Sequence, residues 1–382
     1  MNISETVDTI IELRNQGAAP DEKVAEYLKA TLWAADAHVQ VQRIFYSPHS
    51  RSLVVAAAFV LCAVFLVSLL KRRHRAAFIS ALAIPLILFL EFSLDLHLVS
   101  WPIQKKSENI VAQFPVQDAA RRVIVGTHYA DSKTAASDRL AETVSAFLLP
   151  ITLVITLLGL WQVAMYFGKF DFEDAHTIAL IMGSVCAIYY ALAFGVFSNG
   201  AAPLRKATDP EHNAGSIAAL AALAEDLSQK YPRLQNTWVT VAFFGRGGPE
   251  GLGAVSFAGK LARERDRALA TYFIGCEHLG RGGSHGYVLP DMAAMAPLYA
   301  DRELLRTLNR AAVITTGRQL GITRGTMTNS KGFVEYGFPT VSITTTPPEG
   351  NPGSRRIDRG QLLLSLQLLE TCLSEFETGR LR

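Results

Sequence analysis

Four short stretches of this sequence combine histidine, carboxylate and glycine residues beside apolar runs of strand or helix length. Imidazole and carboxylate side chains bind divalent metals and transfer protons, so these stretches are the candidates for chemistry. The glycine-rich parts lack the lysine and hydroxyl residue of a phosphate-binding loop. The four cysteines form no metal or redox motif. The stretches are Gly126–Asp131, Glu211–Gly215, Gly245–Gly253 and Gly275–Gly283.

The segments around these stretches alternate between strand and helix patterns. Helical periodicity is predicted over Ser4–Ala35, with a break at Gly17–Pro20, and over Ser216–Gln229, Ala293–Leu320 and Gln361–Phe376. Strands are predicted at His38–Tyr46, Ile110–Phe114, Arg122–Gly126, Trp238–Phe244, Ala270–Cys276 and Thr340–Thr345. This alternation predicts an α/β fold with a mixed, mostly parallel sheet and helices on both faces. In such sheets, functional groups collect at the carboxyl ends of the strands.

Two pairs of long apolar runs interrupt this pattern. They are Leu53–Leu70 with Ala76–Leu90, and Ala146–Phe167 with Ile178–Phe197. Runs that stay apolar on every face for about 20 residues predict membrane-spanning helices. We therefore expect an integral membrane protein with two transmembrane hairpins, at residues 52–97 and 144–197. Residues 1–50, 98–140 and 198–382 are expected to form one soluble α/β domain, and the polar first 50 residues predict no cleavable signal peptide.

The distribution of charged residues predicts the orientation of the chain in the membrane and argues against nucleic acid as a partner. The cluster Lys71–Arg75 between the first two spans favours a cytoplasmic loop, which makes the soluble domain extracytoplasmic. We expect the bacterial inner membrane. The net charge is only +3 and no basic stripe is present, so nucleic acid is not an expected partner. Glu91 and Asp95 near the end of a span either lie at the membrane interface, which is the favoured interpretation, or belong to an ion pathway.

The order of the four polar stretches, followed by Gly337-Phe338-Pro339-Thr340, resembles peptidase family 28. This family comprises the dinuclear-zinc aminopeptidases and includes glutamate carboxypeptidase and the transferrin receptor. The resemblance implies an eight-stranded mixed sheet and two zinc ions at the strand ends. A bridging carboxylate would join the metals, and a Glu-Glu pair would supply the general base and one ligand.

Three positions of the family's metal site keep a side chain that can bind zinc. The first histidine ligand falls on His128, the bridging aspartate on His212, and the aspartate after the next strand on Glu277. In the family these three belong to the same metal. Two imidazoles and a carboxylate form a three-ligand zinc set with an open fourth position, so one zinc is the implied cofactor. In the alternative interpretation, His128 and Glu277 are relics held by hydrogen bonds and His212 is a surface residue.

The other positions of the family's site are lost. The Glu-Glu pair falls on Gly247 and Gly248, and the final histidine ligand falls on Ser330. The companion aspartate of the first histidine falls on Ala130, with Asp131 displaced by one. Glycine cannot accept a proton from water, and one imidazole cannot bridge two cations.

Two neighbouring residues have competing interpretations. Glu250 would restore a base if the loop were aligned with a gap, but Pro249 and Glu250 more simply begin a helix. His278 should point away from the site if its strand continues past Glu277.

The leading functional hypothesis is a membrane-anchored, family-28-like protein with a degenerate zinc site. It would be catalytically impaired, or a pseudoenzyme that binds a peptide or a partner, as the transferrin receptor illustrates for this family. The alternative is an active mononuclear-zinc aminopeptidase or amide hydrolase, and a third hypothesis makes the spans the working part. Because the second hairpin separates His128 from His212, the expected partners include the membrane, a peptide, or a neighbouring membrane protein.

Overall fold

The structure, a computed structural model, describes two compact units. The sheet unit comprises Met1–Ile44, Lys106–Ser132 and Ala207–Arg382, and the helical unit comprises Phe45–Lys105 and Lys133–Lys206. The described residues are 2–16, 19–46, 50–92, 99, 105–130, 136–168, 173–201, 211, 213–229, 234–245, 251–264, 269–289, 300–324, 330–346 and 357–378.

The sheet unit is built on eight strands. They are β1 His38–Tyr46, β2 Lys105–Phe114, β3 Arg121–His128, β4 Thr237–Phe244, β5 Ala270–Glu277, β6 Ser284–Leu289, β7 Gly321–Arg324 and β8 Thr340–Thr346. Their order in the sheet is β1-β2-β4-β3-β5-β8-β6-β7. The central strands β4, β3, β5 and β8 are parallel, whereas β2 runs antiparallel to β4 and β6 antiparallel to β8. The predicted mixed, mostly parallel sheet is confirmed.

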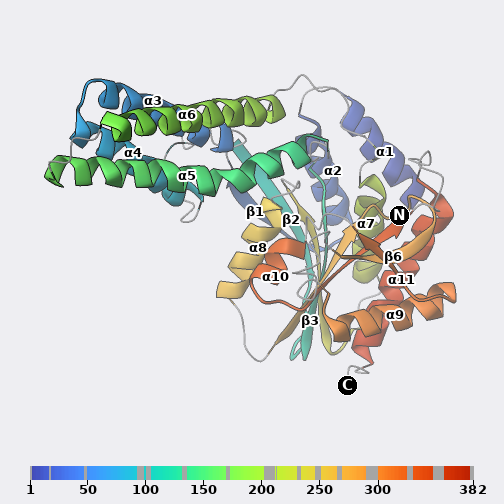
Figure 1. Ribbon diagram of the computed structural model, residues 1–382. Helices are drawn as coiled ribbons and strands as arrows, with labels where there is room; N and C mark the ends of the chain where they lie inside the picture. Colours follow the sequence, from blue (N-terminus) through green and yellow to red (C-terminus); the bar gives the residue numbers. More distant parts are fainter. Residues whose placement is uncertain are drawn as a thin grey trace. The chain divides into compact units, whose positions relative to one another are not determined.

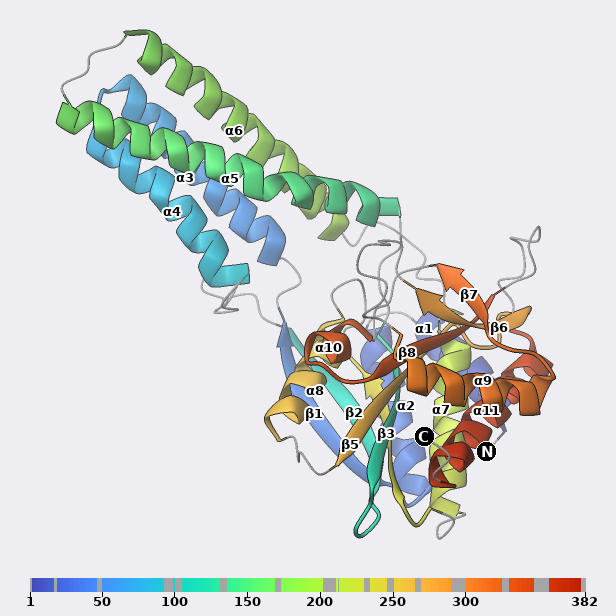
Figure 2. The same ribbon diagram turned by 60° about the horizontal axis from the view of Figure 1, so that its bottom comes forward.

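Helices cover both faces of this sheet (Figures 1 and 2). Alternation along β3 separates the faces, because Val123 and Val125 join one core while Ile124 joins the other. The first core packs under α1 Ile3–Asn15, α2 Pro20–Ala34, α7 Ala214–Gln229, α9 Arg302–Thr316 and α11 Arg359–Glu377. The second core packs under α8 Leu252–Arg263 and α10 Ser330–Glu335.

The helical unit is a bundle of α3 Ser50–Leu70, α4 His74–Phe92, α5 Ala136–Gly168 and α6 Glu173–Ala201. Each helix contacts two others, in the cyclic order α3, α4, α5, α6. A Cβ added at Gly159 would lie 2.5 Å from the Cβ of Ala81, so α4 and α5 approach closely there. Polar side chains pair inside the bundle: Thr152 Oγ1 lies 2.9 Å from the hydroxyl of Tyr190, and His74 Nδ1 lies 2.9 Å from Gln162 Oε1.

All four helices of this bundle are long and apolar enough to cross a membrane. By length and composition, the candidate spans are Ser52–Leu70, His74–Glu91, Thr143–Phe167 and His176–Ser198. They coincide with the four apolar runs of the sequence.

The chain leaves the sheet unit for the helical unit from one edge of the sheet. The carboxyl ends of β3, β4, β5 and β8 define this edge, and the antiparallel β2 begins there. Gln40 and Gln42 of β1 hydrogen-bond to Gln113 and Asn109 of β2, so these two strands run in opposite directions and β1 ends at the same edge. Helix α7, which follows the second pair of candidate spans, begins beside the ends of β3 and β5.

Candidate functional site

His128 and Glu277 lie at the carboxyl edge, on neighbouring parallel strands. Gly126 of β3 is in register with Gly275 of β5, and each side chain lies two residues beyond its glycine. Strand alternation therefore places His128 and Glu277 on the same face of the sheet, the face that packs under α8 and α10. Only 2% of His128 and 4% of Glu277 is exposed. Two of the three predicted ligand residues thus lie at the ends of neighbouring strands, on one face of the sheet.

The third predicted ligand, His212, lies outside the described residues, as do Asp131, Gly247, Gly248 and Glu250. The predicted helix start at Pro249 and Glu250 therefore also concerns residues outside the described part of the chain. The helix that follows, α8, begins at Leu252, with Gly251 as its N-cap. The assignment of His128, His212 and Glu277 as a ligand set stays a prediction.

Asn213, next to His212, ties the strand ends together. Its Nδ2 donates to Thr127 Oγ1 and to the carbonyl oxygen of His128, both at 2.7 Å, and its Oδ1 accepts from the amide of His278 at 2.9 Å. Thr127 Oγ1 donates in turn to the carbonyl of Cys276 at 2.8 Å. We call these four hydrogen bonds the Asn213 clasp. Asn213 is buried and has a φ of 57°, a left-handed conformation that asparagine tolerates better than most residues.

His278 does not continue strand β5, so the condition under which it would point away from the site is not met. The strand ends at Glu277, and His278 has a φ of 53°. Strand alternation therefore does not determine its direction. Its backbone amide belongs to the Asn213 clasp, and its carbonyl accepts a hydrogen bond of 2.8 Å from Thr345 Oγ1 of β8.

Ser330, at the position of the family's final histidine ligand, begins α10 and is fully buried. Its hydroxyl is hydrogen-bonded to the hydroxyl of Ser342 in β8. A Cβ added at Gly275 would lie 2.6 Å from Ser342 Oγ and 2.9 Å from Ser330 Oγ. Two neutral hydroxyls thus pack closely against Gly275 at this position.

A cluster of five phenylalanines supports the same face below His128 and Glu277. Phe333 of α10 stacks on Phe273 of β5 with ring centroids 3.7 Å apart and planes inclined by 7°. Phe244, Phe257 and Phe338 surround the Phe333 ring at centroid distances of 5.9–6.2 Å. The ring of Phe244 also explains Gly126, where an added Cβ would lie 2.6 Å from it.

Three other titratable side chains near this edge are held neutral or bind the backbone. Burial raises the pKa of the Tyr129 phenol, whose hydroxyl donates to the carbonyl of Glu108 at 2.7 Å. Burial likewise raises the pKa of the Cys276 thiol well above its usual range, so this cysteine stays protonated and is no nucleophile. Arg14 of α1 donates to the carbonyl of Tyr129 at 2.9 Å.

The donor set tests the zinc centre that the resemblance implies. No group of three His, Cys, Asp or Glu side chains among the described residues is placed to hold a metal ion. His128 and Glu277 supply two donors, and the neutral Ser330 and Ser342 hydroxyls are not typical zinc ligands. The donors among the described residues are too few for a dinuclear centre. A mononuclear centre would need a third ligand from outside the described residues, and His212 is the predicted one.

The arrangement of the sheet unit defines a class of fold, the zinc-aminopeptidase-like α/β fold, and solved structures agree. A zinc aminopeptidase from Bacillus subtilis matches with a TM-score of 0.52 and 10% identity, over 100% of this chain and 96% of that chain. Fimbriiglobus ruber glutaminyl cyclase matches with a TM-score of 0.53 and 11% identity, over 98% and 94%. An aminopeptidase from Aneurinibacillus sp. strain AM-1 matches with a TM-score of 0.51 and 11% identity, over 97% and 93%.

The comparisons of sequence gave no match. No protein-family model matches this chain, and no curated protein matches it. The likeness to the aminopeptidases and glutaminyl cyclases is therefore one of fold, and a shared fold does not determine the chemistry of the edge.

His285 of β6 is a buried histidine that the sequence did not single out. Its Nδ1 accepts from Gln361 Nε2 at 3.1 Å, and its Nε2 lies 2.8 Å from Ser365 Oγ, both on α11. Because the amide nitrogen of Gln361 can only donate, the ring proton is on Nε2. Burial lowers the pKa of His285 from 6.5 to about 4.

This lowered pKa predicts a loss of stability in acid. The unfolded chain takes up a proton on His285 below pH 6.5, whereas the folded chain resists it until about pH 4. The free energy of unfolding of the sheet unit should therefore fall by about 2 kcal/mol as the pH drops from 6.5 to 4. Urea unfolding followed by tryptophan fluorescence measures this slope. In His285→Asn, the number of protons taken up on unfolding between pH 6.5 and pH 4 should be lower by about one. An unchanged pH dependence of the unfolding free energy in that variant would contradict the assignment of the lowered pKa to His285.

Proposed function

We propose that this chain is a membrane-anchored protein that binds a peptide or a protein partner in a degenerate, catalytically impaired zinc-aminopeptidase cleft. The observation that carries the proposal is the buried hydroxyl pair of Ser330 and Ser342 at the position of the family's final ligand. In this proposal, the pair leaves the second metal without its histidine ligand, which supports a degenerate site. The sequence places Gly247 and Gly248 where the family has its Glu-Glu pair, which removes the general base.

The alternative function is an active mononuclear-zinc aminopeptidase or amide hydrolase. The buried pair of His128 and Glu277 at neighbouring strand ends favours it, with His212 as the third ligand. When bound, such a zinc ion polarises a carbonyl group and lowers the pKa of its water. Because glutaminyl cyclases are among the similar structures, the amides to be tested include an amino-terminal glutamine.

Metal analysis of the purified full-length protein separates the two functions. The proposed pseudoenzyme contains well below one zinc per chain after incubation with zinc and washing. The mononuclear enzyme contains one zinc per chain, and His128→Ala and Glu277→Ala should each lower its zinc affinity by more than tenfold. The matched controls are His38→Ala and Glu264→Ala, which change exposed residues away from the edge.

Activity assays complete this comparison. Hydrolysis of a leucyl peptide, or ammonia release from a glutaminyl peptide, that disappears in both site variants and persists in both controls would overturn the pseudoenzyme proposal. Peptide binding without turnover that is weakened in the site variants supports it.

The connections between the two units support a partner that belongs to the membrane. Four chain segments link the sheet unit to the candidate spans. They leave from the ends of β1 and β3 and enter at the starts of β2 and α7, all at the edge that carries His128 and Glu277. We therefore propose that the ligand is presented by the bilayer or by a neighbouring membrane protein.

The orientation that we propose places the sheet unit outside the cytoplasm of a bacterial inner membrane. Its support is the basic cluster Lys71–Arg75, which follows α3 and extends into the first two residues of α4. A cysteine at Arg73, in a chain whose own four cysteines are serines, should stay unlabelled by an impermeant maleimide added to intact cells. A cysteine at the exposed Glu264 should be labelled. The reverse pattern would refute the orientation.

A further inference from the structure

A groove in the helical unit lies between α5 and α6, near the end of α5 and the start of α6. Its cavity volume is about 530 Å³, within the range of ligand sites. The two helices are in contact and run side by side (Figures 1 and 2). Val154, Leu157, Leu158 and Trp161 line the groove from α5, at the spacing of one helix face. The first and last of these lie about 10 Å apart along the helix axis.

The lining of this α5–α6 groove is apolar and open on one side. Ile178 and Ala179 line it from α6. Leu157, Trp161 and Ile178 are 55%, 51% and 58% exposed, and all three lie in candidate spans. The inference that follows rests on the membrane anchoring proposed above, because in a bilayer these exposed side chains face acyl chains.

The contact between α5 and α6 is closed beyond the groove. The hydroxyl groups of Thr152 and Tyr190, both buried, lie 2.9 Å apart there. The neighbouring contact between α4 and α5 is tight at the level of the groove, where a Cβ added at Gly159 would lie 2.5 Å from the Cβ of Ala81. The groove is therefore a local opening in an otherwise closely packed bundle.

An acidic residue lies at one end of the groove. Asp174, the second residue of α6, lines the groove one helical turn before Ile178. Its side chain is exposed and forms no hydrogen bond or ion pair with any other residue that the structure describes. The first turn of a helix favours an acidic residue. That preference does not account for the apolar opening beside it.

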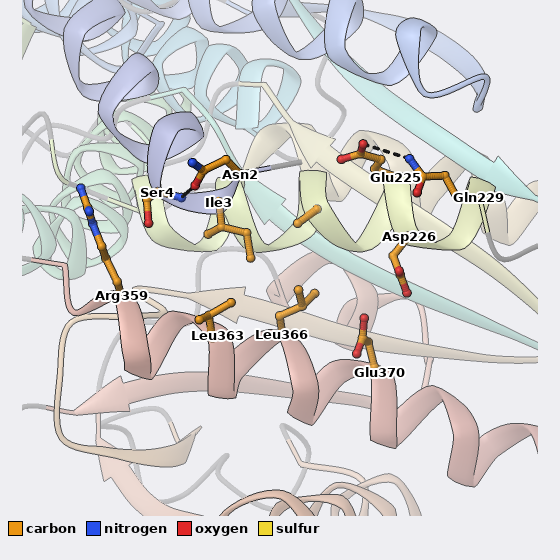
Figure 3. A pocket seen from close by; sticks show the side chains of 11 residues that line it. Asn2, Ile3, Ser4, Glu225, Asp226, Gln229, Arg359, Leu363, Leu366 and Glu370 are labelled. Atoms are coloured by element: carbon orange, nitrogen blue, oxygen red, sulfur yellow. Dashed lines mark hydrogen bonds between the residues drawn. The ribbon is translucent and has the colours of Figure 1, made fainter.

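The groove drawn in Figure 3, on the sheet unit between α7 and α11, differs in this respect. Its cavity volume is about 330 Å³. Arg359 in this groove forms an ion pair of 3.3 Å with Asp8, and Glu225 accepts a hydrogen bond of 3.1 Å from Gln229. Charged groups that already have partners do not indicate a ligand.

We propose that the α5–α6 groove binds one molecule of a membrane lipid whose headgroup carries a primary ammonium. One acyl chain lies along the apolar lining, and the ammonium donates charge-assisted hydrogen bonds to the carboxylate of Asp174. An anionic headgroup would be repelled by this carboxylate. A quaternary ammonium has no N–H group to donate, and an uncharged apolar molecule would leave the carboxylate unmatched.

Native mass spectrometry of the full-length protein in detergent tests this proposal. The added lipids are phosphatidylethanolamine, phosphatidylcholine and phosphatidylglycerol with identical acyl chains. The first molecule of phosphatidylethanolamine should bind about tenfold more tightly than either of the others. Equal affinities, or a preference for another headgroup, would overturn the proposal.

Variants of Asp174 assign the headgroup. Asp174→Asn should lower the affinity for phosphatidylethanolamine about tenfold and leave that for phosphatidylcholine unchanged. Asp174→Glu keeps the charge and should retain the preference. Glu264→Gln, which removes an exposed charge from the sheet unit, should bind as the unaltered protein does. A full preference in Asp174→Asn would refute the role of this carboxylate.

A second pair of variants assigns the acyl chain. Ile178→Trp places a larger ring in the groove and should lower the affinity for all three lipids about tenfold. Leu192→Trp is the matched control, because Leu192 lies on the same helix, is 66% exposed and does not line the groove. Unaltered affinities in Ile178→Trp, or equal losses in both variants, would show that the lipid lies elsewhere.

Failure of the membrane anchoring is distinguishable from failure of the groove. Extraction of the chain from membranes by sodium carbonate would overturn both, because spanning helices resist it. Retention in the membrane without a preference for phosphatidylethanolamine would overturn the groove alone. His128→Ala and Glu277→Ala should leave the lipid affinities unchanged, whatever they do to zinc.

Discussion

Replacing Phe333 with alanine should lower the free energy of unfolding of the sheet unit by about 4 kcal/mol. The ring is fully buried, stacks on Phe273, and is surrounded by Phe244, Phe257 and Phe338. An alanine would leave a cavity among rigid rings that collapse poorly around it. The helical unit, which contains none of these residues, should be unaffected.

Thiol labelling measures this loss in the full-length protein. Cys276 and Cys372 are buried in the sheet unit, so they react only when that unit opens, and mass spectrometry separates them from Cys62 and Cys186 of the bundle. Phe333→Leu should cost clearly less, because it keeps most of the volume. Ile322→Ala, at an exposed position, should cost less than about 0.5 kcal/mol. A loss below about 1 kcal/mol for Phe333→Ala would show that the cluster is loosely packed.

Replacing Asn213 with alanine should lower the free energy of unfolding of the sheet unit by about 3 kcal/mol. Three buried hydrogen bonds are lost, and the buried groups that made them are left without a hydrogen-bond partner from this side chain. The substitution also puts alanine at a φ of 57°, which adds backbone strain. The same labelling of Cys276 measures the effect. We expect a direct response there, since the Cys276 carbonyl accepts from Thr127 within the clasp.

Asn213→Gly separates the two contributions. Glycine adopts the left-handed conformation without strain, so this variant should lose the hydrogen bonds alone and be less destabilised than Asn213→Ala. If glycine restored the stability of the unaltered chain, backbone conformation would account for the whole effect, and the clasp would contribute nothing.

Most of the central sheet could be predicted from the sequence because its strands are continuous apolar runs. Val123-Ile124-Val125 of β3 and the corresponding segments of β4, β5 and β8 are buried on both faces, which is the condition that produces such runs. The helix starting near Ser216 and the one from Gln361 to Phe376 were predicted for a similar reason, an apolar stripe.

The outer strands β6 and β7 were not predicted. β6 contains Ser284, His285 and Gly286, and β7 is the short segment Gly321–Arg324. Neither alternates clearly, because β7 is an edge strand and the polar His285 of β6 has its partners in α11. When tertiary contacts stabilise the pairing of a strand, its local amino-acid composition does not indicate a strand clearly.

At the site, the sequence predicted that His128 and Glu277 would share the edge, since both follow apolar strands of a parallel sheet. It did not predict the Asn213 clasp or the pairing of Ser330 with Ser342. Those contacts join residues far apart in the chain, and a polar residue before a helix or within a strand has many alternative partners. The one available signal was asparagine itself, which accepts a positive φ.

The common exit edge of the sheet unit also bears on how the protein folds. β1 and β2 are neighbours in the sheet, although residues 47–104 separate them in the chain. Closing a loop of that length costs entropy, but α3 and α4 pack against each other and return the chain to its starting side. Once this helix pair has formed, only residues 47–49 and 93–104 remain to be closed, which saves roughly 1 kcal/mol. The two helix pairs therefore lower the effective contact order of the sheet, and synthesis of each pair prepares the strand pairing that follows it.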